Sequence, residues 1–585
     1  MDIFGVLSLF GGLAMFLFGM DVMGKGLERQ AGNKLQSLLE KLTSNPLKGF
    51  VLGLGVTAII QSSSATTVMV VGFVNAGIMQ LKQAVGIIMG ANVGTTVTSW
   101  ILSLSGISGD SFFIKMLKPS SFTPILAVIG IILFMTSKTD KKKNIGTILL
   151  GFAVLMFGME QMSGAVKPLT DVPQFTNLFT LFTNPVLGII VGAVLTAVIQ
   201  SSSASVGILQ ALSVTGAVTY ANAVPIIMGQ NIGTCITALL SSVGANKSAK
   251  RAAAVHLYFN IIGVIVFCIL FYSAKAVLNF SFINDPVSQV GIAVVHTAFN
   301  VTATVIILPF SNFLVKLACM TVKDKENETN AEDSISLDER FFAVPAVAVS
   351  HSEQVAVKMF KISNKAVTEA ISVIKSFSNE KVSDIENLET EVDKYEDVLG
   401  SYLVKLSNKD MTDSDSRRIS RILHTIGDFE RISDHAVNIK KAAQEMNEKG
   451  ISFSSEAKIE LNVLEEAIKR ILEISENAFE KNDVAEAKKV EPLEQVVNEL
   501  ARTVKSRHVE RLKNGTCTIE LGFILSDLIN NYERIADHCS NIAIAIIEVN
   551  RGSFDTHGYI IDIKESKDGD YTNMYNEYRK TYALG

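Results

Sequence analysis

Long stretches without a charged side chain dominate the first part of this chain. No Asp, Glu, Lys or Arg occurs at positions 49–81, at positions 83–109, or at any position from 172 to 246. A membrane-spanning helix needs only about 20 apolar residues, so these runs can contain several passes or re-entrant segments. The core helices of a soluble protein cannot easily absorb an uncharged run as long as the last of these.

Five further apolar segments complete a polytopic pattern. They are residues 3–20, 120–137, 144–159, 252–274 and 287–315. Beyond about Phe341 the pattern changes to amphipathic helix, with apolar residues three or four positions apart and few Gly or Pro. We therefore predict an all-α protein in which a polytopic membrane domain precedes a soluble bundle of about six helices.

The distribution of charge supports this division. Up to Met320 there are 18 Lys and Arg and 9 Asp and Glu, whereas the rest of the chain carries 35 basic and 49 acidic side chains. This contrast excludes one uniform soluble fold and a disordered chain. The polar stretch 321–340 has no long apolar run, which predicts a linker. The other predicted parts are residues 1–143, 144–320 and 341–585.

An internal repeat relates the first two parts. At one constant offset, without a gap, the sequence QSSSA at Gln61 aligns with QSSSA at Gln200, and GANVGT at Gly90 aligns with GQNIGT at Gly229. Between segments 45–66 and 184–205, 12 of 22 positions are identical. Chance does not produce this similarity, so the membrane domain arose by duplication.

Loop charges indicate that the two copies are inverted. Loop 105–111 has no Lys or Arg, whereas its counterpart 244–251 has three, and four Lys lie in the connector 138–143. By the positive-inside rule, the connector and the second loop are cytoplasmic and the first loop is external. The extra span 120–137 then inverts the second copy, and the last two spans leave the acidic part in the cytoplasm. Inverted repeats with broken apolar segments are typical of secondary transporters.

Serine clusters inside the apolar runs are the candidate substrate site. The two motifs contribute six hydroxyls, those of Ser62, Ser63, Ser64, Ser201, Ser202 and Ser203. Hydroxyls and the free N–H groups of a broken helix suit an oxyanion, and two such ends facing each other could hold a tetrahedral anion without Lys or Arg. Cations would then have to arrive with the substrate to balance its charge. The candidate sodium ligands are the side-chain oxygens of Gln61, Gln200, Asn92, Asn231, Thr95 and Thr234.

Helix packing is the alternative explanation for a single QSSS motif. Small residues let membrane helices approach closely, and Ser often bonds to the preceding turn of its own helix. The presence of both motifs in both copies favours a binding site instead. Two histidines in apolar spans, His256 and His296, are more simply explained as packed or hydrogen-bonded helix residues, so we do not assign them to the site.

At these residues the chain resembles the type II sodium–phosphate cotransporter family, over essentially all of residues 1–320. The resemblance implies that the six serines bind phosphate and that the Gln, Asn and Thr residues of the motifs help to bind sodium. One departure from the repeat is that Thr96 is replaced by Cys235 in the second copy, so that pair is given no role.

The acidic part contains a second repeat. ERISDHAVNI at Glu430 corresponds to ERIADHCSNI at Glu533. Two carboxylates stand at positions i and i+4 in each copy: Glu430 with Asp434, and Glu533 with Asp537. Like charges at this spacing destabilise a helix by ~0.2–0.5 kcal/mol unless something neutralises them. A hard metal ion such as Mg, Mn or Fe would do so. Ion pairing with Arg431 and Arg534 is the alternative.

This acidic part resembles PhoU, a two-fold repeat of three-helix bundles that binds metals through E/DxxxD motifs and regulates phosphate uptake. The resemblance implies a divalent or trivalent metal at the four carboxylates just named. Glu389 and Asp393 form a further pair, but their counterparts are Glu494 and Asn498. The two metal sites are therefore expected to be unequal, or one of them to be empty.

We expect a sodium-coupled phosphate symporter of the cell membrane that works by alternating access, with phosphate between the QSSS motifs and regulation by a cytoplasmic PhoU-like domain. A phosphate exporter is the alternative within transport, because the same site can work in either direction. A membrane phosphate sensor or scaffold is the alternative from another class. The expected partners are phosphate, sodium, the bilayer and either a regulatory protein or a second copy of the chain, but not nucleic acid. No P-loop, nucleophile-elbow or HExxH motif occurs, so an enzyme is not expected.

Overall fold

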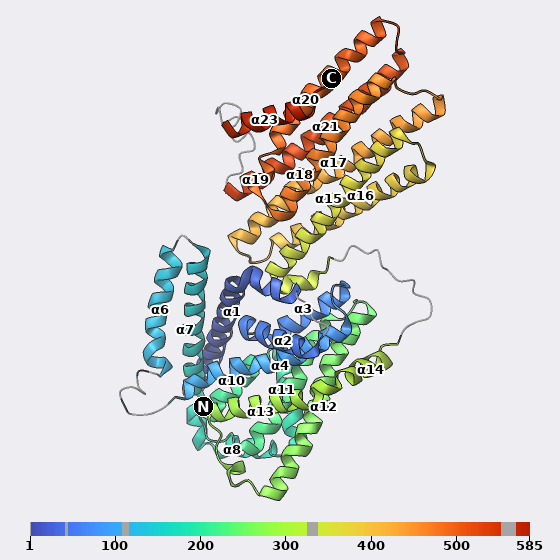
Figure 1. The fold of residues 1–585 in the computed structure, drawn as a ribbon. Coiled ribbons are helices and arrows are strands. Elements are labelled where there is room, and N and C mark those ends of the chain that lie inside the picture. The colour runs from blue at the N-terminus through green and yellow to red at the C-terminus, as the bar shows by residue number, and fades with distance from the viewer. Residues whose placement is uncertain are drawn as a thin grey trace. The chain divides into compact units, whose positions relative to one another are not determined.

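The computed structural model describes residues 2–40, 45–107, 111, 116, 118–137, 139–323, 337–551 and 569–584 (Figure 1). The chain divides into two compact units, Met1–Val347 and Ala348–Gly585. Within the described ranges the regular structure is helical, apart from one isolated β-bridge between Thr219 and Pro286. The predicted all-α fold is confirmed.

Three predicted connections fall partly outside the described residues. These are residues 108–110 of the expected external loop, Lys138 of the connector, and residues 324–336 of the expected linker.

Seven helices in the described part of the first unit are long and apolar enough to cross a membrane. They are α1 (Ile3–Glu40), α4 (Leu81–Ser103), α6 (Pro119–Thr136), α7 (Asp140–Val166), α11 (Tyr220–Ser241), α12 (Lys247–Leu278) and α13 (Gln289–Ile307). The five apolar segments read from the sequence all correspond to members of this set, the last of them continuing into α14 (Ser311–Thr321). Many large apolar side chains on these helices are exposed, for example Ile125 and Val128 of α6 and Ile269 of α12. Such faces are suited to lipid. The chain is a multi-pass membrane protein.

Two apolar segments are broken rather than continuous. Their helices are α2 (Pro46–Ile60), α3 (Ser63–Asn75), α9 (Pro185–Ile199) and α10 (Ser202–Ser213), and the short α8 (Pro173–Leu181) precedes α9. Asn45 and Asn184 cap α2 and α9, and each is followed by a proline at the first helical position. The helices then stop at Gln61 and Gln200, which adopt left-handed conformations with φ of 61° and 58°. Because α9, α10 and α11 begin at the repeat equivalents of the first residues of α2, α3 and α4, the fold repeats as the sequence does.

Glycines bring the crossing helices of each repeat into backbone contact. A Cβ atom added to Gly53 of α2 would lie 2.0 Å from the carbonyl oxygen of Ile87 in α4, and one added to Gly90 would lie 2.0 Å from that of Phe50. The equivalent glycines of α9 and α11 meet the equivalent carbonyl oxygens at 2.0–2.1 Å. The first glycine of the GxNxGT motif is therefore explained by helix packing. Its Asn and Thr remain as candidates for a site.

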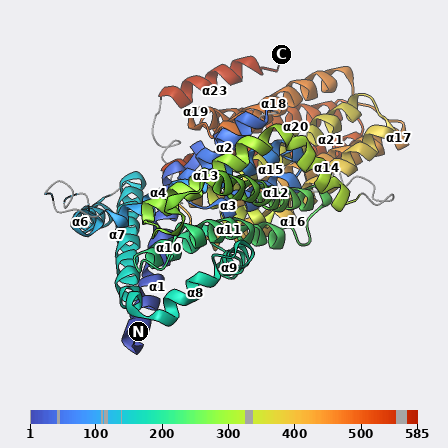
Figure 2. The ribbon, with the colours of Figure 1, turned by 90° about the horizontal axis from the view of Figure 1, so that it is seen from below.

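The first helices of the two repeats cross in the same way. α1 and α7 lie side by side (Figure 1 and Figure 2). A Cβ atom on Gly19 of α1 would lie 2.2 Å from the backbone nitrogen of Leu155, and one on Gly158 of α7 would lie 2.3 Å from that of Phe16. The side chains of Phe16, Leu155 and Met159 form a buried apolar cluster at this crossing. Larger residues at either glycine would separate the helices.

Six long helices form most of the second unit. They are α15 (Pro345–Lys375), α16 (Asn379–Ser407), α17 (Asp413–Lys449), α18 (Ser455–Lys481), α20 (Val490–Lys513) and α21 (Ile519–Arg551), with the short α19 (Val484–Ala487) and α23 (Gly569–Thr581) beside them. The repeated ERI(S/A)DH sequences lie on α17 and α21, which pack together.

Reciprocal contacts of two histidines show the two-fold symmetry of the second unit. The rings of His435 and His538 are 5.6 Å apart. The Nδ1 atom of His435 lies 2.8 Å from the Asn531 amide oxygen, and that of His538 lies 2.8 Å from a carboxylate oxygen of Asp428. Both contacts join positions that the repeat of this unit relates, so the sequence repeat is also a structural one.

Candidate functional site

The first serine of each QSSS motif starts a new helix. Ser62 caps α3 by accepting a hydrogen bond from the N–H of Ala65 at 3.1 Å. Ser201 caps α10 by accepting one from the N–H of Ala204 at 3.2 Å. These two hydroxyls therefore satisfy backbone groups at the break, as a helix N-cap does elsewhere. Each of these two hydroxyl oxygens therefore already accepts one hydrogen bond in the absence of a ligand.

The next two serines lie in the first turn of each new helix. Ser63, Ser202 and Ser203 are buried, with 4–6% of each residue exposed, and Ser64 is half-buried. In the described part of the chain, the backbone N–H groups of these four residues have no hydrogen-bond acceptor. Aligned peptide dipoles give such a turn a positive partial charge. Each copy therefore offers an anion several N–H and O–H donors inside an apolar unit.

A pair of hydroxyl contacts braces each break. The hydroxyl of Thr57 in α2 donates to that of Thr66 in α3 at 3.0 Å, and Thr196 in α9 contacts Ser205 in α10 at 2.9 Å. All four side chains are buried. The sequence analysis missed these residues, although the offset that aligns the two QSSS motifs also relates the two pairs and would have found them.

The Thr residues of the GxNxGT motifs keep oxygen lone pairs available. Thr95 and Thr234 are buried and donate their hydroxyl protons to the carbonyl oxygens of Ala91 and Gln230, one turn earlier in the same helix. Their oxygens can then accept a cation. The broken helices α3 and α10 both pack against α4 and α11, which carry these motifs. No direct hydrogen bond joins the two QSSS motifs among the described residues.

The two predicted glutamine ligands differ. Gln61 is 6% exposed; its amide oxygen accepts from the Thr98 hydroxyl at 2.9 Å and its amide nitrogen donates to the carbonyl of Ala58. Gln200 is exposed, and the threonine equivalent to Thr98, Thr237, donates within its own helix. Gln61 therefore closes the end of α2, and its amide oxygen has one further lone pair for a cation.

A polar cavity of about 440 Å³ lies at the far end of α10. Its lining includes Ser213 of α10, Gln289 of α13, Glu160 of α7 and Lys118. Beside it, the amide nitrogen of Gln289 donates to the backbone oxygen of Gln210. Gln210 is fully buried and donates in turn to the backbone of α4. The hydrogen bonds of Gln210 and Gln289 therefore lie between the serines at the start of α10 and the cavity at its end.

The first carboxylate cluster of the second unit fits a metal ion. Oxygens of Glu389, Asp393 and Asp434 all lie within 4.8 Å of one another. Burial, together with the carboxylates of Asp434 and Asp393, raises the pKa of Glu430 to about 7. Burial and the neighbouring carboxylates also raise the pKa of Glu389 and of Asp393. This cluster joins α16 and α17, and its all-oxygen donors suit Mg²⁺, Mn²⁺ or iron.

The second cluster is already neutralised by the protein. The ammonium group of Lys505 lies 2.6 Å from a carboxylate oxygen of Glu533, and Arg534 lies 3.4 Å from Asp537. Asn498 stands where the first copy has Asp393. Ion pairing therefore explains the carboxylates of this copy, whereas the first copy has three carboxylates close enough to share a metal ion.

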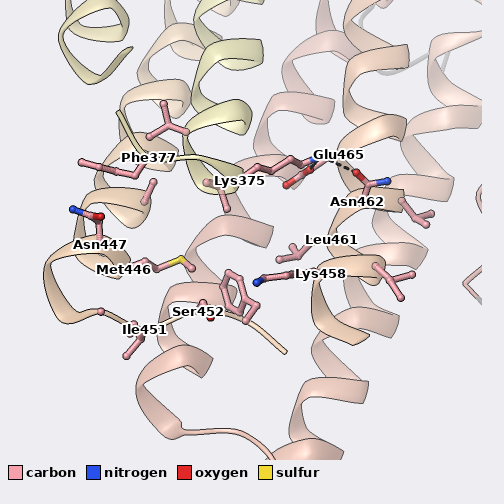
Figure 3. Close-up of a pocket in the computed structure, with 17 residues that line it drawn as sticks. Lys375, Phe377, Met446, Asn447, Ile451, Ser452, Lys458, Leu461, Asn462 and Glu465 are labelled. Atoms are coloured by element: carbon pink, nitrogen blue, oxygen red, sulfur yellow. Dashed lines mark hydrogen bonds and ion pairs between the residues drawn. The ribbon is translucent and has the colours of Figure 1, made fainter. Parts of the chain in front are cut away.

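A cavity of the second unit is separate from both clusters. It has a volume of about 680 Å³ and lies among side chains that include Met446, Ile451 and Leu461 (Figure 3). Glu465, which is almost fully buried, pairs with Lys375 at 2.8 Å. None of the residues predicted for a site lines this cavity.

Comparison with known proteins agrees with the repeat architecture. The model of the Na+/Pi-cotransporter family matches residues 15–164 and again residues 154–299. The chain is 32% identical over 314 residues to the uncharacterized protein YqeW of Bacillus subtilis, covering 97% of that protein and 54% of this chain. This chain belongs to the Na+/Pi-cotransporter family. The PhoU domain model also matches this cotransporter-family chain twice, at residues 356–443 and 461–546.

Relatives of this cotransporter-family member share different parts of it. The candidate inorganic phosphate export protein YjbB of Escherichia coli is 22% identical over 549 residues, which is 93% of this chain and 97% of YjbB. The human sodium-dependent phosphate transport protein 2B is 34% identical over 110 residues, 18% of this chain and 16% of that protein. The crystal structure of PhoU from Pseudomonas aeruginosa is 21% identical, with a TM-score of 0.33, and covers 35% of this chain and 98% of that one.

Removing one buried hydroxyl should weaken phosphate binding. We expect Ser63→Ala and Ser202→Ala each to raise the half-saturating phosphate concentration by roughly tenfold or more, since a hydrogen bond to a charged group contributes about 1.5–3 kcal/mol. Phosphate transport by purified variants in vesicles measures this. Ser103→Ala, which removes another buried hydroxyl of the first unit, is the matched control. Unchanged phosphate dependence in both site variants would place the substrate elsewhere.

The first carboxylate cluster should make the metal-free second unit less stable as pH rises. The pKa of Glu430 is about 7 in the folded state, against about 4.3 for an ordinary glutamate. The folded state therefore binds a proton that the unfolded state has released, and stability falls between about pH 4.5 and pH 7.5. Thermal unfolding of residues 345–585 with a chelator measures this slope. Mn²⁺ should restore stability at the higher pH.

Glu430→Gln should remove much of this pH dependence. Glu533→Gln is the matched control, because Lys505 already pairs with Glu533. A slope that survives Glu430→Gln would contradict the assignment of the pH dependence to Glu430. Mn²⁺ that does not stabilise the unsubstituted unit would contradict the metal assignment.

Proposed function

We propose that this protein is a sodium-coupled transporter of inorganic phosphate rather than an enzyme, placed in the cell membrane with its second unit in the cytoplasm. The observation that carries the proposal is the pair of helix starts after Gln61 and Gln200. Each combines unpaired backbone N–H groups with serine hydroxyls inside an apolar unit. Family membership names phosphate and sodium as the ions to test.

Neutral donors suit a transported anion. N–H and O–H groups replace the hydration of phosphate without adding a fixed positive charge. Phosphate bound in this way can be released when the donors become wet or separate. Its charge must then be balanced by cations that travel with it. The oxygens of Thr95 and Thr234, the motif asparagines and the carbonyl ends of α2 and α9 are the proposed ligands of sodium.

The direction of transport follows from gradients and not from the site alone. The name of YjbB refers to phosphate export, whereas that of the human relative refers to sodium-dependent transport. A site of hydroxyls and amides works in both directions, so uptake is our first proposal and export the second. A phosphate sensor would bind the same ion without moving it across the membrane.

Phosphate flux should follow an imposed sodium gradient. Purified protein is placed in vesicles with radiolabelled phosphate on both sides of the membrane. The vesicles should gain phosphate under an inward sodium gradient and lose it under an outward one. A potassium gradient of the same size is the control. Flux that ignores sodium would contradict coupling, and phosphate binding without flux would favour the sensor.

A segment at the end of the predicted linker covers one end of α3. This segment is the 3-10 helix Glu339–Ala343 with Asp338 before it. The side-chain amide of Asn75, at the end of α3, donates to Asp338 at 2.7 Å. The guanidinium of Arg340 donates to the backbone oxygen of Ser241 at 2.6 Å. Phe341 is fully buried there.

The internal repeat allows the end of α3 that this segment covers to be compared with the end of α10. Asn75 is equivalent, at the offset that aligns the two QSSS motifs, to Val214, which lines the polar cavity at the end of α10. The segment therefore lies at the α3 end that corresponds to the cavity-bearing end of α10. Because α15 begins at Pro345, directly after this segment, we propose that the second unit regulates transport by holding or releasing it.

Loosening this segment should raise the transport rate. Arg340→Ala and Phe341→Ala remove its contacts with α3 and α11, so we expect faster phosphate flux at saturating substrate without a change in half-saturating phosphate. Initial rates in vesicles test this. Glu339→Gln, at an exposed position in the same turn, is the control. Slower flux in both variants would make the segment a structural anchor.

A further inference from the structure

Two buried asparagines outside the recognised motifs occupy equivalent roles. Asn260 of α12 and Asn300 of α13 each follow a histidine by one helical turn, in the similar sequences HLYFN and HTAFN. Both asparagines are 1% exposed. Neither belongs to the repeat that carries the QSSS motifs, yet each contacts one GxNxGT motif.

The hydrogen bonds of Asn260 fix which way its amide points. Its Nδ2 atom donates to the backbone oxygen of His256 at 2.9 Å and to the Sγ atom of Cys235 at 3.3 Å. A carbonyl oxygen can only accept, so the amide nitrogen must face His256 and the amide oxygen must face away. That oxygen accepts from the Nδ2 atom of Asn92 at 3.4 Å.

The second copy has the same chain of hydrogen bonds. Asn300 donates through Nδ2 to the backbone oxygen of His296 at 2.9 Å. Its amide oxygen accepts from the Nδ2 atom of Asn231 at 2.6 Å. The contact is shorter here than between Asn92 and Asn260, so the orientation of Asn231 is held more firmly.

This polarity determines what the motif asparagines offer to a ligand. The amide nitrogens of Asn92 and Asn231 are directed at α12 and α13, and their amide oxygens accept no hydrogen bond from the described residues. An oxygen suits sodium, whereas an NH₂ group in its place would repel it. In a buried site the wrong orientation would leave two oxygens facing each other without a proton between them.

We propose that Asn260 and Asn300 are positioning residues that turn the side-chain oxygens of Asn92 and Asn231 toward sodium. Each cation site would then be completed by a helix that follows both repeats. The proposal rests on the proposed sodium coupling and names how that site is kept selective for a cation.

The sodium dependence of transport distinguishes a positioning role of Asn260 and Asn300 from a role in helix packing. In the full chain in vesicles, Asn260→Ala and Asn300→Ala should raise the half-saturating sodium concentration by roughly threefold to tenfold, with the larger effect at Asn300. At saturating sodium the half-saturating phosphate and the maximal rate should stay near those of the unsubstituted protein. Phe299→Leu, a packing change beside Asn300 on the same helix, is the matched control and should leave sodium dependence unchanged.

A conservative variant and a mutant cycle test the geometry itself. Asn300→Asp in its protonated form can still donate to His296 and accept from Asn231, so at mildly acidic pH it should recover most of the sodium affinity lost in Asn300→Ala. Asn231→Ala and Asn300→Ala should be non-additive in their effect on half-saturating sodium. Asn92→Ala and Asn300→Ala, whose side chains contact different asparagines, should be additive.

Three results would overturn the proposal. One is a fall in rate or folding in Asn300→Ala with sodium dependence unchanged, and another is additivity within the Asn231–Asn300 pair. The third is Asn300→Asp behaving no better than Asn300→Ala, which would mean that packing alone is involved. If the unsubstituted protein moves phosphate without regard to sodium, the proposed function fails first and this proposal fails with it.

Discussion

Backbone hydrogen bonding inside an apolar unit is the constraint on which the first unit depends. A helix in lipid satisfies its own N–H and C=O groups, so a break must be supplied with partners or with a ligand. Here the chain stops one helix at Gln61 and another at Gln200, and each following helix is capped by a single serine. The remaining N–H groups of the first turn are left for an anion. The transport proposal follows from this incomplete satisfaction.

Close packing by glycine keeps the breaks in place. Gly53 and Gly90 let α2 and α4 touch through their backbones, and the second copy has the same contacts. A buried hydroxyl pair, Thr57 with Thr66, then spans the break itself. These contacts involve backbone and hydroxyl groups, so the break is held without lysine or arginine.

The second unit shows how duplicated sequences can diverge in chemistry. Its first copy gathers carboxylates, and burial together with their mutual repulsion raises the pKa of Glu430. In its second copy, Lys505 and Arg534 pair with the equivalent carboxylates, those of Glu533 and Asp537. One copy therefore suits a metal ion and the other a fixed ion pair. Both copies keep the reciprocal histidine contacts between α17 and α21.

The sequence alone was enough to predict the all-α class, the membrane helices and both repeats, the first of which carries the QSSS motifs. The lengths of hydrophobic segments, the distribution of charge and internal duplication are local or periodic patterns, so they are visible in the sequence. It did not determine which polar atoms are free, because that depends on partners distant in the chain. Gln61 is bound by Thr98, and Asp434 gains Glu389 and Asp393 from another helix. Such pairings depend on tertiary packing, because a hydrogen bond or a carboxylate cluster forms only where packing brings its members close together.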